Sequence, residues 1–219
     1  MNVMTLLRRL SIIAMLLFAL PSEVPAQFIG QLTTAENLQP KRRLFGGYLG
    51  FYEKVTIVAM TQYRYGFTNF LDGGFQFGGF SADIGEEDEA GIVFGGNIKY
   101  RILNAAAGDQ FDLSSGIGLE TAQASNYHLY SLSGSIIGSF RLQSSSGKLI
   151  TPYSRMAFHV QNTHWDQHGL HEKGTSDSDF DLGLNLGAQF SLNNNSSIIA
   201  ELQLENGFFG FIAGINYIK

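Results

Sequence analysis

The chain of 219 residues contains no cysteine, only four prolines and a single tryptophan. Without cysteine it forms no disulfide and carries no lipid anchor on a cysteine at a cleavage site. An exported chain without disulfides must be stabilised by a large core or by a membrane. Charged residues are scarce too, at 15% against roughly 25% in a soluble domain, which indicates that much of the surface does not face water. The net charge of -5 argues against nucleic acid as a partner.

The first 26 residues have the pattern of an export signal. Arg8 and Arg9 form a basic start, and residues 10–20 are an apolar run too short to span a bilayer as a helix. Val24-Pro25-Ala26 supplies small residues for cleavage before Gln27. A single anchoring helix and the twin-arginine export route are the alternatives, but the run is short and the arginine pair lacks the rest of that motif. Removing Arg8, Arg9 and Glu23 would change the net charge from -5 to -6.

A strict two-residue period runs through residues 180–192, where apolar side chains alternate with Asp181, glycine and small polar residues. In a β-strand successive side chains point to opposite faces, so this segment predicts a strand with one apolar and one polar face. The same pattern recurs along the chain, no helical period competes with it, and no later stretch is long enough for a transmembrane helix. The pattern predicts about ten strands, near 44–51, 55–65, 72–82, 92–103, 111–121, 129–142, 150–161, 180–192, 198–204 and 208–217.

The composition of the two faces favours a membrane barrel over a soluble one. In a soluble barrel the polar face is exposed to water and carries roughly 25–35% charged residues. Here the polar face is mostly glycine, serine, asparagine and glutamine, which suit a crowded lumen, and aromatic residues gather near the strand ends. We therefore expect an all-β fold, a single closed antiparallel transmembrane β-barrel. A soluble secreted barrel that binds a hydrophobic ligand is the less favoured alternative.

The lengths of the connections predict the topology. With both termini in the periplasm, the connections after odd-numbered strands lie outside the cell, and those after even-numbered strands are short periplasmic turns. The outer connections then include an acidic loop at 85–91 and the longest loop at 163–179. We expect a signal peptide at 1–26, an N-terminal periplasmic tail at 27–43, which lacks alternation, and an outer-membrane barrel at 44–219.

Two segments carry a family resemblance. Residues 65–74, Tyr-Gly-Phe-Thr-Asn-Phe-Leu-Asp-Gly-Gly, are similar to the periplasmic turn between paired strands of small bacterial outer-membrane β-barrel proteins. The alternating apolar residues of 209–217 resemble the C-terminal assembly signal of that outer membrane protein beta-barrel domain family. This chain departs from the family's aromatic last residue, because it ends Ile218-Lys219. The resemblance implies a monomer in the cell outer membrane that contacts lipid and lipopolysaccharide, is inserted by the assembly machinery, and has no cofactor.

Strand parity also predicts a charge network inside the barrel. The cations fall toward the periplasmic end and most acids toward the outer mouth, with Asp112 low among the cations and Glu201 nearer the middle. This distribution fits either a salt-bridged plug or a narrow polarised pore, and the narrowness of ten strands favours the plug. The predicted members are Arg64, Lys99, Arg101, Arg141, Arg155, Asp112, Glu120, Asp181, Glu201 and Glu205.

Two predicted loops contain side chains that could bind metal ions. His164, His168 and His171 could supply imidazoles to zinc, but their spacing matches no established site and a solvated loop is favoured. The acidic run at 86–89 could attract calcium or bridge to lipopolysaccharide, but it lacks the spacing of a calcium loop. We therefore expect neither run to be a specific metal site.

Catalytic residues do not stand out. His128 and Ser131 would point to opposite faces of a strand, and His159, which could approach Asp181, has no evident nucleophile. We expect no enzyme, and predict a structural or interaction role or a narrow porin-like passage for small solutes or ions. A membrane-embedded lipid-modifying hydrolase or protease is the main alternative.

Overall fold

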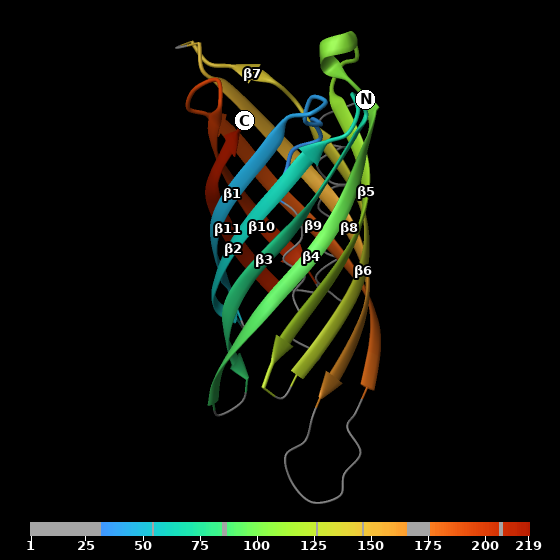
Figure 1. Cartoon of the computed structure of the whole chain (residues 1–219), viewed down its shortest axis with the longest axis vertical. Coiled ribbons are helices and arrows are strands. Elements are labelled where there is room, and N and C mark those ends of the chain that lie inside the picture. The colour runs from blue at the N-terminus through green and yellow to red at the C-terminus, as the bar shows by residue number, and fades with distance from the viewer. Residues whose placement is uncertain are drawn as a thin grey trace, which may run out of the picture.

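The computed structural model describes residues 32–53, 55–84, 87–125, 127–145, 147–165, 176–205 and 208–219. Ten long, tilted strands form one closed antiparallel barrel (Figure 1). Each strand pairs with its neighbours in sequence, the pairing of β1 with β11 closes the wall, and β6 pairs directly with β8 around the two-residue strand β7. The strands are β1 (Arg43–Tyr52), β2 (Val55–Gly66), β3 (Leu71–Ile84), β4 (Glu87–Leu103), β5 (Asp112–Ala124), β6 (Tyr127–Ser139), β7 (Leu142–Gln143), β8 (Leu149–Trp165), β9 (Ser176–Ser191), β10 (Ser196–Glu205) and β11 (Phe208–Ile218).

The alternation in the sequence sorts side chains between the two sides of the wall. Apolar residues point outward and are exposed, for example Ile117 and Leu119 at 65% and Phe180 at 69%. Their neighbours in sequence point into the lumen and are buried, as Asp181 and Glu120 are. An apolar outer surface around a polar interior is the arrangement of a barrel surrounded by lipid. Among the described residues, no helix is long and apolar enough to cross a membrane.

The predicted number of wall strands is confirmed, and the main differences lie at one end of the barrel. The prediction of an acidic loop at 85–91 was wrong, because β3 and β4 remain paired as far as Ile84 and Glu87. The loop at 163–179 is also shorter than predicted, since β8 extends to Trp165 and β9 begins at Ser176. Polar and acidic residues continue these ladders at the outer end, because strands that extend beyond the membrane into water can carry them.

The C-terminus and the 3-10 turn η1 (Ala105–Ala107) lie at the opposite end (Figure 1). The prediction that this end carries the short connections was wrong: the connections here span 67–70, 104–111, 140–148 and 192–195, whereas at the other end only two residues separate β1 from β2, β3 from β4, β5 from β6 and β10 from β11. With both termini in the periplasm, as expected from the sequence, the end that carries the C-terminus is the periplasmic end. The predicted turn after β2 is present, since β2 ends at Gly66 and β3 begins at Leu71.

Residues 32–38 enter the lumen at the periplasmic end and form no strand. Leu32 and Ala35 are fully buried there, and Gln62 of β2 contacts both the N–H and the carbonyl oxygen of Leu32. Gly66 makes room for the entry, because a methyl group on its Cα would collide with Gln39 O and Leu38 O. The sequence-based prediction of a periplasmic tail at 27–43 did not include this packing. We call residues 32–38 the lumenal segment.

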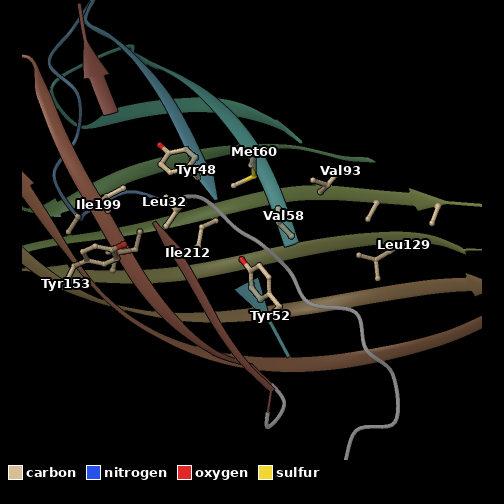
Figure 2. Packing of buried hydrophobic residues seen from close by; sticks show 14 residues of the cluster. Leu32, Tyr48, Tyr52, Val58, Met60, Val93, Leu129, Tyr153, Ile199 and Ile212 are labelled. Carbon is tan, nitrogen blue, oxygen red and sulfur yellow. The ribbon is translucent and has the colours of Figure 1, made fainter. Parts of the chain in front are cut away.

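Apolar side chains also fill part of the lumen. Tyr48 and Tyr52 of β1, Met60 of β2 and Ile212 of β11 point into the barrel beside Leu32 (Figure 2). The interior is therefore packed with side chains as well as with the lumenal segment.

Candidate functional site: the charged lumen

An ion cluster occupies the periplasmic half of the lumen. Arg64 on β2 forms an ion pair with Asp72 on β3, and its other terminal nitrogen donates to Asn97 Oδ1 at 2.6 Å. Lys99 Nζ lies 3.6 Å from the second oxygen of Asp72. All three charged side chains are at most 1% exposed. Burying charges at this depth is costly unless they are paired and hydrogen-bonded, as they are here.

The same lysine binds the lumenal segment. Lys99 Nζ donates to Thr33 Oγ1 at 2.9 Å, to Thr34 O at 2.8 Å and to Glu36 O at 2.7 Å. Asp72 accepts the N–H of Leu38 at 2.9 Å. One buried cation and one buried carboxylate thus satisfy backbone groups that have no strand partner, which fixes the segment in the lumen.

The network continues to the periplasmic mouth. Arg141 Nε lies 2.6 Å from Glu36 Oε1 and 3.7 Å from Asp112 Oδ2. Arg101 donates to Asn69 O at 2.6 Å. Arg141 follows the end of β6 and is partly exposed, so it lies at the mouth and not within the strand predicted at 129–142.

A second cluster joins β8 and β10. Arg155 Nη2 lies 2.5 Å from Glu201 Oε1, and both side chains are buried. Tyr153 OH donates to Glu201 Oε2 at 2.8 Å, and Gln203 Nε2 donates to Oε1 at 2.7 Å. Arg155 therefore pairs with the acid that was predicted nearest the middle, and Glu201 accepts from donors of three kinds, a guanidinium, a hydroxyl and amides.

The remaining predicted acids line the outer half, and two of them accept a hydrogen bond from a glutamine amide. Gln76 Nε2 donates to Glu120 Oε2 at 2.5 Å, and Gln161 Nε2 donates to Asp181 Oδ2 at 2.8 Å. Glu205 Oε1 lies 3.8 Å from His159 Nε2. The ten residues predicted for the network thus fall into three groups, at the periplasmic end, around Arg155, and along the outer half.

Sequence reasoning missed the residues that link the lumenal segment to the wall. Asp72 has the right parity for the lumen, but it also belongs to the turn motif at 65–74. Glu36 and Thr33 lie in a stretch without alternation, and Thr33 is 66 positions from its partner Lys99. Parity alone could have found Asp72, whereas no local signal places Glu36 or Thr33.

The histidines form no metal centre among the residues whose placement is described. His164 lies on β8, opposite His128 and Ser176, and its side chain is exposed. His168 and His171 lie outside the described residues, as does residue 86 of the acidic run. The expectation that these histidines form no specific zinc site therefore stays a prediction.

The lumen does bring together a serine, a histidine and an aspartate. Ser133 and Asp181 lie directly opposite His159 on the two neighbouring strands, so a potential nucleophile was missed. Their bonds do not form a catalytic relay, because the Ser133 hydroxyl donates to Gly118 O at 3.3 Å. His128 and Ser131 are on opposite faces, as predicted.

No protein-family model matches the chain, and no curated protein matches it either. Its fold is similar to solved bacterial barrels at low identity. The N-terminal β-barrel domain of Pseudomonas aeruginosa OprF is 9% identical, with 83% of this chain and 100% of that chain covered and a TM-score of 0.42. The β domain of the Bordetella autotransporter BrkA is 10% identical, with 80% of this chain and 97% of that chain covered and a TM-score of 0.45. The KdgM porin is 10% identical, with 80% of this chain and 98% of that chain covered and a TM-score of 0.40. Likeness at this level says nothing about function.

The closed wall, the apolar exterior and the polar interior together identify the class. The chain is an outer-membrane β-barrel protein.

Proposed function

We propose that this protein is a closed-lumen outer-membrane barrel with a structural or interaction role. Its role is non-catalytic, and its partners are outer-membrane lipid, lipopolysaccharide and the assembly machinery. The observation that carries the proposal is the position of Lys99, which is fully buried and donates three hydrogen bonds to the lumenal segment.

Closure is supported at two levels of the lumen. The lumenal segment fills the periplasmic half, and the group around Arg155 and Glu201 joins β8 to β10 further along. A hydrated ion passing through would have to separate these buried ion pairs, which costs several kcal/mol for each unpaired charge, about 3–5. A barrel of ten strands is too narrow to leave a second path for the ion around these pairs.

A second candidate function is a gated passage for small ions. The lumenal segment belongs to no strand, so the ten-stranded wall is complete without it. Its removal would expose the periplasmic cations to solvent. In this case the closed barrel is the resting state of a narrow pore.

Planar-bilayer recording separates the two functions. The mature protein is expected to show no unitary conductance, and a variant lacking residues 27–38 is the matched test of the segment. Silence from both proteins supports the closed structural barrel, whereas conductance only from the deletion supports the gated passage. Steady conductance from the intact protein would overturn the closure. Heat-modifiable migration in gels confirms that both proteins are folded.

A further inference from the structure

A basin of about 780 Å³ opens at the periplasmic mouth. Its wall combines the lumenal segment, the turn between β2 and β3, and the loop that contains η1. Three arginines line it, namely Arg42, Arg101 and Arg141, together with the two acids Glu36 and Asp109. Most of these lining segments lie at the periplasmic mouth of the barrel, so the basin opens toward water.

Both acids already have partners. Glu36 is paired with Arg141 at 2.6 Å, and Asp109 accepts the N–H of Asn104 at 2.7 Å. Arg141 also lies 3.7 Å from Asp112, so its charge is largely compensated. The electrostatic character of the basin therefore depends on the other two arginines.

Arg42 and Arg101 have no carboxylate partner among the residues that the structure describes. Arg101 is held in place by its bond to Asn69 O, while its Nε atom is buried with no hydrogen-bond acceptor in the same described set. A guanidinium presents several donors in a fixed fork that fits oxyanions. Two such groups beside one cavity indicate an anionic ligand.

We propose that this basin binds a peptide-like periplasmic ligand that carries at least two carboxylates. Apolar residues line the basin beside the arginines, including Phe70, Ile102 and Ile218, and these suit the carbon skeleton of such a ligand. The proximity of Glu36 and Asp109 favours singly charged carboxylates over a more highly charged phosphate, because repulsion grows with charge. The inference deepens the interaction role proposed above and rests on its orientation in the membrane.

Binding can be measured with the full mature barrel in an uncharged detergent. The probe is fluorescein-labelled tetraglutamate, followed by fluorescence anisotropy at low salt, with tetraglutamine as the uncharged control. Saturable binding of tetraglutamate alone is expected. It should weaken about tenfold in Arg42→Gln and in Arg101→Gln, since a hydrogen bond to a charged group contributes that much. Lys148→Gln removes the same charge at a periplasmic turn outside the basin and should leave binding unchanged.

A variant that is expected to bind more tightly controls for loss of binding through poor folding. Asp109→Asn keeps an oxygen for the Asn104 N–H but removes a repulsive charge, so about threefold tighter binding is expected. Equal binding by the wild type and by both arginine variants would overturn the proposal. So would binding only to vesicles that contain phosphatidylglycerol, which would assign the arginines to lipid phosphate. Anisotropy is independent of conductance, so the two proposals can fail separately. A barrel that conducts and still binds tetraglutamate would contradict the proposed closure of the lumen but support this binding site.

Discussion

The two halves of the lumen neutralise buried acids in different ways. In the periplasmic half, Asp72 faces a guanidinium and an ammonium group, and the same lysine holds a separate piece of chain. In the outer half, Glu120 and Asp181 are bonded to glutamine side chains. Arg155 is the one lysine or arginine among the described residues that faces the lumen beyond the periplasmic cluster, and it is paired with Glu201.

This difference indicates where the barrel is rigid and where it is adaptable. An ion pair fixed by several hydrogen bonds is strongly disrupted by the loss of one partner. Removing the amide beside a buried carboxylate should cost less folding stability, because no opposite charge is left unpaired. The periplasmic half should therefore behave as the cooperative closure, and the outer half as a more tolerant lining.

The largest expected effect is that of Asp72→Asn, which leaves Arg64 and Lys99 buried without their carboxylate. We expect a loss of about 3–5 kcal/mol in the free energy of unfolding, measured by urea titration in lipid vesicles. Glu53→Gln, at an exposed bend, is the matched control and should change little. A loss at Asp72 no larger than that of the control would remove the distinction between the halves.

A smaller loss is expected for Arg155→Met. Glu201 then loses its cation but keeps the hydroxyl of Tyr153 and the amide of Gln203. The remaining donors should limit the cost to about 2 kcal/mol, close to that of one hydrogen bond to a charged group. The same urea titration measures it, and a loss equal to that of Asp72→Asn would show that the centre is as rigid as the periplasmic end.

The smallest effect is expected for Gln76→Leu. Glu120 loses the 2.5 Å amide bond, and no cation is left unpaired. Unfolding should become easier by about 1.5 kcal/mol, and the lost amide should not change how readily maleimide reacts with a cysteine introduced at position 34 of the lumenal segment. Greater accessibility of that segment in this variant would mean that the two halves are coupled.

The wall was predictable because its sequence pattern is local. A two-residue period places every second side chain in the lumen, and this held for Asp181 and Glu201. The outer strand ends were harder to predict, since the glycine and acidic residues at 85–91 have the composition of a turn. Pairing across the hairpin outweighs that local preference as far as Glu87.

The contents of the lumen were only half predictable. Parity indicated which charges face inward, but it gave neither their partners nor the lumenal segment. Lys99 contacts residues more than 60 positions away, and no local pattern marks Thr33 or Glu36 as its partners. Such contacts follow from the closure of the barrel around the segment, so they become visible only once the strands are placed.

Cysteine labelling tests the lumenal segment most directly, because the natural chain has no cysteine. Thr34→Cys places a thiol at a buried site, and Lys41→Cys places one at the exposed periplasmic mouth. In the folded barrel, maleimide should label position 34 about a hundredfold more slowly than position 41, because labelling requires local opening. After unfolding, the two rates should be equal. Equal rates in the folded barrel would contradict closure of the lumen by its own N-terminal segment.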